Sequence, residues 1–204
     1  VLSSSQPGSL LDTIRSRTVP VLVPPLTERE VVDFLVTRGV AADAVEAAAR
    51  LSGGAIGRAL GYLPLDDGGE GALEAERRAA FTLLRAALAP RMGTVFTEAL
   101  NQKVSGARAL LGLLASLEVW LRDLAAIATG VPDRAVNQDG VPWLSRKARE
   151  RGWPPEAVAR CLARVDEAAV HARGNVNPQL LIAGLLTDLR HILESSTPRA
   201  SHVR

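Results

Sequence analysis

Apolar residues return along most of this chain at intervals of three and four, which is the spacing of one face of a helix. The longest stripe lies in residues 107–129, where leucines recur at i, i+3, i+4 and i+7. No alternating strand pattern follows residue 23. Besides a helix that begins after Thr27, the pattern predicts helices over residues 8–17, 41–51, 56–63, 73–88, 94–103, 107–129, 141–150, 155–173 and 177–193.

The same spacing predicts which side chains face inward. Five groups of apolar residues recur at helical intervals, and they lie in predicted helices on both sides of the glycine-rich residues 65–71. The expected inward positions are Leu10, Leu11 and Ile14; Val31, Val32, Leu35 and Val36; Phe81, Leu84 and Leu88; Val158, Cys161, Leu162, Val165 and Ala169; and Leu181, Ile182, Leu185, Leu189 and Ile192.

Capping residues fix the ends of two helices. Thr27 and Glu30 form a capping box, in which each side chain can bond the backbone amide of the other, and Gly39 is suited to end that helix. Asn177 is a good N-cap, and Pro178 follows at the first helical position, where its missing N–H costs nothing.

The first residues do not follow the helical pattern. Residues 1–5 predict a short strand, and a single strand cannot form a sheet. We therefore interpret it as the end of a truncated α/β domain. Three prolines then force residues 19–25 into an extended linker.

The predicted fold class is all-α, in two helical units. Residues 24–64 form a small three-helix unit, and residues 70–195 form a larger helical bundle. Residues 1–23 hold the end of the truncated domain and the linker, and residues 196–204 form a tail without an apolar pattern.

Composition places the chain among globular proteins. Hydrophobic residues make up 47% and charged residues 23% of its 204 positions, and the net charge is +2. The apolar run at residues 110–117 is far too short to span a membrane, and no signal peptide is visible. The single cysteine, Cys161, excludes an intrachain disulfide and fits a reducing compartment, so we expect a cytoplasmic protein.

The sequence holds little that resembles a catalytic site. His171, His191 and His202 are scattered, and neither a metal-binding motif nor a phosphate-binding loop is present, so we expect no metal ligands. Cys161 lies on an apolar stripe and reads as a core thiol. The glycines at 53, 54 and 57 follow a helix, so they predict a helix end that leads into the next helix.

Two arginine contexts carry candidate chemistry. Arg15 and Arg17 are two residues apart, so on a helix end they point away from each other. One can hold the chain locally while the other projects to a neighbouring protein, where a guanidinium suits a phosphate. Solvated ion pairs are the simpler interpretation of both residues. Arg58, at the start of a helix, can reach a phosphate or cap a carbonyl.

The order of these segments resembles one protein family. Residues 10–18, Leu-Leu-Asp-Thr-Ile-Arg-Ser-Arg-Thr, are similar to the Leu-Leu-Pro-Thr-Ile-x-Ser-Arg-Cys segment of AAA+ clamp-loader subunits. Residues 51–60 resemble the sensor 2 segment of the delta-prime subunits of bacterial DNA polymerase III. Residues 120–124, 137–139 and 175–180 resemble the collar domain of the same family. Asp12 and Thr18 depart from the usual proline and cysteine.

This resemblance implies a fold and a function. Residues 24–64 would be the AAA+ lid, residues 70–195 the collar that assembles the loader ring, and residues 1–5 a remnant of the AAA+ base. Arg17, between Ser16 and Thr18, would be the arginine finger presented in trans to ATP-Mg on a neighbouring gamma/tau subunit. Arg58, which follows the motif glycines Gly53, Gly54 and Gly57, would be the sensor 2 arginine. Because delta-prime subunits commonly do not turn over ATP, it would be a vestige that only shapes the lid.

The implied protein is an accessory subunit of a DNA-directed DNA polymerase holoenzyme and not an enzyme alone. It would bind no cofactor itself, contact the gamma/tau and delta subunits, and reach the sliding clamp and primed DNA through the assembled complex. We expect the leucine stripes of residues 107–129 and 177–193 to drive that association.

Two alternatives remain. A gamma/tau subunit usually has Arg-Asp-Ala at sensor 2, where this chain has Arg58-Ala59-Leu60. A helical DNA-binding or adaptor module without AAA+ ancestry predicts a basic surface concentrated on one helix, whereas arginines here occur in every segment.

Overall fold

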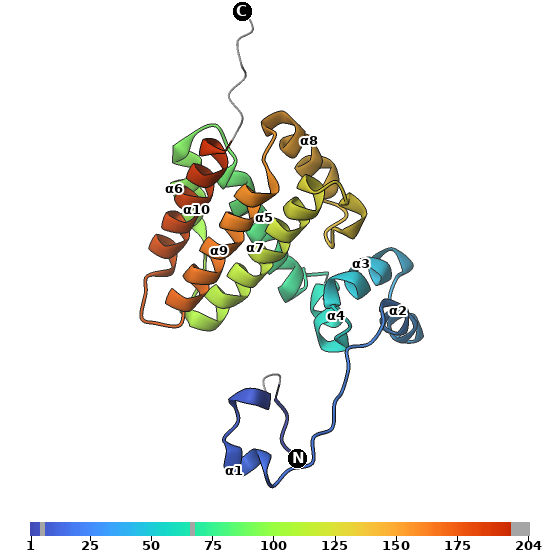
Figure 1. Cartoon of the computed structure of the whole chain (residues 1–204). Helices are drawn as coiled ribbons and strands as arrows, with labels where there is room; N and C mark the ends of the chain where they lie inside the picture. The colour runs from blue at the N-terminus through green and yellow to red at the C-terminus, as the bar shows by residue number, and fades with distance from the viewer. Residues whose placement is uncertain (5–6, 66–67, 197–204) are drawn as a thin grey trace, which may run out of the picture.

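The computed structural model describes residues 1–4, 7–65 and 68–196, and within these ranges it contains helices and no strand. The chain is therefore all-α, as the periodicity predicts. Figure 1 shows an N-terminal arm, a small group of three helices and a larger bundle. The elements are η1 Pro7–Ser9, α1 Asp12–Arg15, α2 Glu28–Thr37, α3 Ala42–Ser52, α4 Ile56–Tyr62, α5 Ala72–Ala87, α6 Met92–Asn101, α7 Gly106–Ala128, η2 Pro132–Arg134, α8 Val141–Arg151, α9 Pro155–His171 and α10 Pro178–Ser195.

The N-terminal arm differs from the prediction. Residues 1–4 form no strand, and the helix expected over residues 8–17 is reduced to η1 and the four-residue α1. Neither element buries a residue: Leu11 is exposed, and Leu10 and Ile14 are half-buried. A strand without a partner has no ladder to join, and a helix this short needs a packed face that the arm does not supply.

The linker after α1 is extended, as its prolines predict. The side chains of its apolar residues are 82–90% exposed, so nothing in the described part of the chain covers them. They are Val19, Val21, Leu22 and Val23.

Helices α2, α3 and α4 form the three-helix unit, which has its own apolar core. Thr27 accepts a hydrogen bond from the Glu30 amide, and the Glu30 carboxylate accepts one from the Thr27 amide at 2.8 Å, so the predicted capping box is confirmed. Val36 was expected inside but is 58% exposed, because the buried line of α2 follows Val31 and Leu35 at i and i+4. The core comprises Val31, Leu35, Val45, Ala48, Ala49, Ala59 and Leu63.

Helices α5 to α10 form the bundle, with α7 at its centre. α7 packs against α5, α8 and α9, while α10 packs against α5, α6 and α9. The leucine stripe of α7 is buried, as predicted, and so are Val158, Cys161 and Val165 of α9. Leu162, Ala169, Leu181 and Ile192 pack against this core from half-buried positions.

Several helix ends match the capping signals. Asn177 accepts from the Leu180 amide at 3.0 Å, and Pro178 opens α10. α6 begins at Met92, two residues before the predicted start. α10 extends to Ser195, and the predicted tail beyond residue 196 lies outside the described residues.

Within the part of the chain that the structure describes, no helix combines the length and apolar character needed to cross a membrane.

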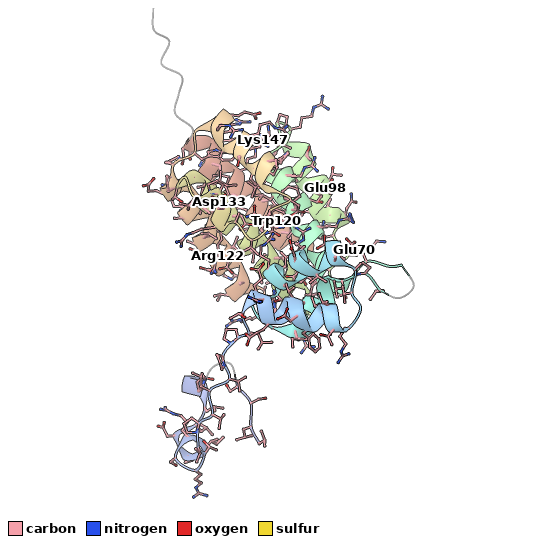
Figure 2. All side chains as sticks on the ribbon, turned by 90° about the vertical axis from the view of Figure 1, so that its right-hand side faces the viewer. Glu70, Glu98, Trp120, Arg122, Asp133 and Lys147 are labelled. Atoms are coloured by element: carbon pink, nitrogen blue, oxygen red, sulfur yellow. The ribbon has the colours of Figure 1, made fainter. Side chains whose placement is uncertain are left out.

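Trp120 of α7 is held from three sides in the middle of the bundle (Figure 2). Its ring stacks on Phe81 with centroids 4.2 Å apart, and its indole nitrogen donates to the Arg77 carbonyl at 3.0 Å. Gly140 covers the remaining side: a Cβ there would lie 2.2 Å from Trp120 Cζ3. The loop before α8 can therefore approach α7 only with glycine at this position.

Replacing Gly140→Ala should lower the free energy of unfolding by about 1–3 kcal/mol, because the pinned indole cannot give way. The matched variant Gly184→Ala, on α10 with no atom within 4 Å of the added methyl group, should raise it by up to about 1 kcal/mol through helix propensity. Urea denaturation measures both values. Equal effects of the two substitutions would contradict the packing described.

Candidate functional site

The Ser16-Arg17-Thr18 segment lies on the turn that follows α1. Thr18 Oγ1 donates to the Ile14 carbonyl at 3.0 Å, and Ser16 Oγ donates to the Thr13 carbonyl at 3.4 Å, so the two hydroxyls hold the turn. Arg17 stands between them with an exposed side chain and, within the described residues, no ion pair or side-chain hydrogen bond.

Arg15 behaves differently from Arg17. Its guanidinium pairs with Asp12 three residues earlier, with 3.2 Å between Nη1 and Oδ1. The division of roles expected for the two arginines is thus visible in the structure, although α1 ends before Arg17. Arg15 is held locally by Asp12, and Arg17 is the one that projects outward.

The glycine segment connects α3 to α4 as a helix end, as predicted. Gly53 ends α3 in the left-handed region at φ 60°, and Gly54 follows at φ 83°. Gly54 also allows close packing, because a Cβ there would lie 2.3 Å from the Leu26 carbonyl oxygen. Gly57 has open space around it, so nothing in the described packing requires glycine at that position.

Arg58 lies in the first turn of α4. Its Nη2 donates to the Tyr62 hydroxyl at 3.2 Å, one turn further along the same helix. Arg58 is therefore engaged locally, and no hydrogen bond or ion pair of the described residues joins it to Arg17 on the arm. The structure keeps the two predicted arginine contexts separate.

A buried polar cluster was not predicted from the sequence as a unit. Asp123 of α7 is 2% exposed and accepts three hydrogen bonds, from the Val136 amide at 2.7 Å, the Asn137 amide at 2.9 Å and Asn137 Nδ2 at 2.6 Å. The carboxylate thus anchors the loop between η2 and α8. The helical spacing of the leucines on either side gives no sign that Asp123 faces inward.

Arg77 of α5 extends the cluster to a third element. It makes bidentate contacts with Glu74 and Asp139, and it donates to Asn137 Oδ1 at 3.0 Å. Burial alone would lower the pKa of Arg77, but the bonds from Glu74 and Asp139 outweigh it and raise that pKa. Arg77 therefore stays charged and ties α5 to the same loop.

A cleft of about 330 Å³ lies between the three-helix unit and the bundle. Its charged side chains are Arg50, Arg77, Glu74 and Asp139. Both carboxylates are bonded to Arg77, so neither is free to act as a general base. The remaining lining is mostly apolar, and the arrangement points to a joint between two units; it comprises Ala44, Ala47, Ala48, Leu51, Tyr62, Val136 and Gln138.

The remaining candidate residues have no reactive setting. Cys161 is buried in the bundle, and its burial raises the pKa of the thiol to about 12. His171 and His191 are exposed, and His202 lies outside the described residues. In the described part of the chain, no group of three His, Cys, Asp or Glu side chains could hold a metal ion.

Among the described residues, helix α6 carries an exposed apolar stripe. Met92, Phe96 and Leu100 of α6, at i, i+4 and i+8, are 40–62% exposed, and we call them the α6 face. The leucine stripes of α7 and α10, which were expected to meet partners, are instead buried in the bundle's own core. That expectation was wrong because periodicity shows that a helix face is buried, without showing what buries it.

These features define an all-α protein with surfaces suited to contact other molecules and, among the described residues, no assembled catalytic group. Comparisons with models of protein families, with curated proteins and with solved structures found no match for the chain.

Substituting Asp123→Ala should lower the free energy of unfolding by about 3 kcal/mol, because three buried N–H donors lose their acceptor. Asp133→Ala, an exposed position in η2, should change it by less than about 0.5 kcal/mol. Chemical denaturation followed by circular dichroism measures both. A loss at Asp123 no larger than that at Asp133 would refute the anchoring role.

Proposed function

We propose that this chain is an assembly subunit of the delta-prime type in a bacterial DNA polymerase III clamp loader. In this proposal α2 to α4 serve as the AAA+ lid and α5 to α10 as the collar. The chain binds no nucleotide itself and assists ATP hydrolysis on a neighbouring gamma/tau subunit. Its setting is the cytoplasm, where the loader acts on the sliding clamp and primed DNA.

The exposure of Arg17 carries this proposal. A finger that acts in trans must project from its own subunit and must not be neutralised by a local carboxylate. Arg17 meets both conditions, while Arg15 two residues earlier is paired with Asp12. The hydroxyl bonds of Ser16 and Thr18 fix the turn on which Arg17 is presented.

The setting of residues 58–60 favours the delta-prime type over the gamma/tau type. Ala59 is 0% exposed and lies in the core of the three-helix unit. The aspartate that gamma/tau subunits usually carry at this place would bury a carboxylate among apolar side chains, which is costly without a partner. Arg58, bonded to Tyr62, then shapes the lid and contacts no phosphate.

The α6 face is the surface through which the proposed collar would meet the gamma/tau and delta subunits. Exposed Met, Phe and Leu side chains in one line on a helix match the apolar anchors of helix-mediated contacts. The exposed valines of residues 19–23 would pack against protein in the same assembly.

Replacing Arg17→Ala in the assembled loader should leave assembly intact and reduce DNA-stimulated ATP hydrolysis at the adjoining gamma/tau site by about 10³-fold, the lower end for an arginine finger. The matched control is Arg15→Ala, which removes an arginine that is already paired with Asp12. Because an exposed ion pair contributes little stability, this variant should hydrolyse ATP within about twofold of the unchanged loader. Steady-state phosphate release measures both. Unchanged hydrolysis in Arg17→Ala would exclude the finger assignment.

A further inference from the structure

Helix α8 concentrates positive charge that the mean composition conceals. Four of its eleven residues are cations and one is an acid. Arg146, Arg149 and Glu150 lie on its exposed side, and Lys147 and Arg151 are half-buried beside them. The pKa of Glu150 is lowered, because Lys147 donates to it and Arg146 and Arg151 add positive charge nearby.

Side chains of α5 and of Leu88, the residue that follows it, lie close to α8 at two levels. Near the start of α8, Trp143 packs edge-on against Phe81 with centroids 5.5 Å apart, and the Arg85 guanidinium lies 5.7 Å from the Trp143 ring centre. Near its end, Arg151 lines a small pocket with Leu88. We call the following side chains the α8 surface, which curves around the exposed half of the helix and has Arg149 and Arg151 on opposite flanks: Arg85, Trp143, Arg146, Lys147, Arg149 and Arg151.

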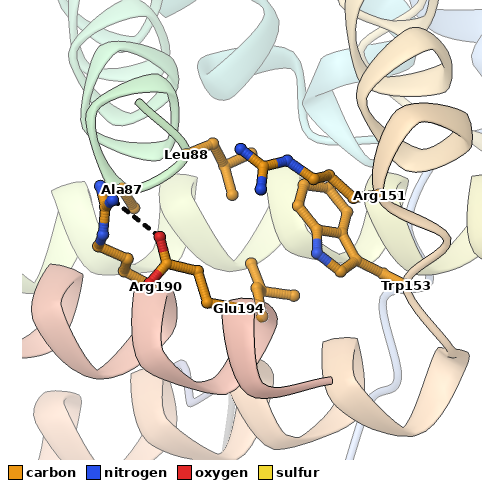
Figure 3. A pocket seen from close by; sticks show the side chains of 7 residues that line it. Ala87, Leu88, Arg151, Trp153, Arg190 and Glu194 are labelled. Atoms are coloured by element: carbon orange, nitrogen blue, oxygen red, sulfur yellow. Dashed lines mark ion pairs between the residues drawn. The ribbon is translucent and has the colours of Figure 1, made fainter. Parts of the chain in front are cut away.

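The pocket at the end of α8 presents an unused donor. Trp153 is 7% exposed, and its indole nitrogen is a buried side-chain donor without a hydrogen-bond partner among the described residues. Figure 3 shows Trp153, Arg151 and Glu194 around this pocket, whose volume is about 10 Å³, enough for one oxygen-sized group.

The other charges of the pocket are already satisfied. Arg190 pairs with Glu194 at 2.7 Å and donates to the carbonyls of Ala89 and Pro90. Arg151, in contrast, has no carboxylate partner within the described residues. The pocket therefore offers the Arg151 guanidinium to an oxygen that accepts hydrogen bonds, beside an unpaired indole N–H that is itself buried.

The charges of the α8 surface are likewise incompletely balanced. Glu150 accepts from Lys147 at 2.6 Å and lies 3.9 Å from Arg146. Arg85, Arg149 and Arg151 make no ion pair in the described part of the chain. A ligand that neutralises the unpaired cations of this surface must be an extended anion with several hydrogen-bond acceptors.

We propose that the α8 surface binds the phosphate backbone of single-stranded nucleic acid. Arg146 and Arg149 take successive phosphates, since a guanidinium forks onto phosphate oxygens. A phosphate oxygen enters the pocket between Arg151 and Trp153. The exposed guanidinium of Arg85, whose Cζ lies 5.7 Å from the Trp143 ring centre, offers a plane on which an unpaired base stacks, as in proteins that bind single strands.

This aromatic and guanidinium plane favours nucleic acid over an acidic peptide, which has carboxylates but no bases. Phosphate contacts make such binding salt-dependent. For three contacts to a single strand, the slope of log affinity against log salt is about −2. The inference does not rest on the clamp-loader proposal, and a basic surface concentrated on α8 is the feature that the helical DNA-binding alternative predicts.

The test is fluorescence anisotropy of a labelled single strand of about 20 nucleotides at low salt, titrated with the protein to about 100 µM, the range of weak electrostatic binding. The double variant Arg146→Gln/Arg149→Gln should weaken binding at least about tenfold and reduce the salt slope by about 1.4. Both positions are exposed, so the fold should be unaffected, which circular dichroism checks.

The matched control is Arg108→Gln/Arg173→Gln, which removes the same charge from exposed positions. Arg108 lies in the first turn of α7 and Arg173 follows the end of α9. Figure 1 shows the start of α7 and the end of α9 at the opposite end of the bundle from α8. This control should bind like the unchanged protein. Equal losses in the two double variants, or no binding at all, would overturn the proposal.

Two further measurements address the ligand class and the stacking. Poly-glutamate of equal charge should compete poorly; competition equal to that of the single strand would assign the surface to an acidic peptide and overturn the proposal. The unchanged protein should prefer the normal strand to an abasic one, and Arg85→Lys should lose this preference while keeping the charge. Equal binding of both strands by the unchanged protein would overturn the stacking part.

Discussion

The buried carboxylate of Asp123 is the interaction on which the architecture of the bundle depends. It accepts three N–H groups from the loop before α8, and Asn137 of that loop accepts from Arg77 of α5. Trp120, one turn before Asp123 on α7, donates to the backbone of Arg77. Because hydrogen bonds are directional, this set fixes how α5, α7 and the start of α8 lie together, which apolar packing alone would leave adaptable.

That fixed arrangement determines which surfaces remain outside. Most leucines of α7 and α10 close the core and are unavailable to partners, while Leu180 in the first turn of α10 is 69% exposed. The α6 face stays exposed on one helix, and the placement of α8 beside α5 brings Trp143 under Arg85 and leaves a buried indole donor in a small pocket. The arm adds an unpaired Arg17 and uncovered valines. In the proposed function, these are the surfaces that would contact other molecules.

The sequence predicts the fold well where local rules decide. The capping box at Thr27, the N-cap at Asn177 and the glycine end of α3 appear as expected, because each is set by a few neighbouring residues. Periodicity identified most buried faces and failed at Val36 and Leu11, where a residue next to the buried line or on a short unpacked helix stays exposed. The Asp123 cluster joins residues 60 apart in sequence, Arg77 and Asn137, and no local signal marks such a pairing.

The central claim, that this chain works by docking its exposed surfaces onto partner subunits, is tested most directly by hydrogen–deuterium exchange of the chain alone and mixed with gamma/tau and delta subunits of one organism. The account predicts slower exchange on mixing in α6 and in residues 19–26, with the amides of α7 unchanged because they are already protected by the core. Exchange in α6 and in residues 19–26 that is the same with and without the partner subunits would contradict it.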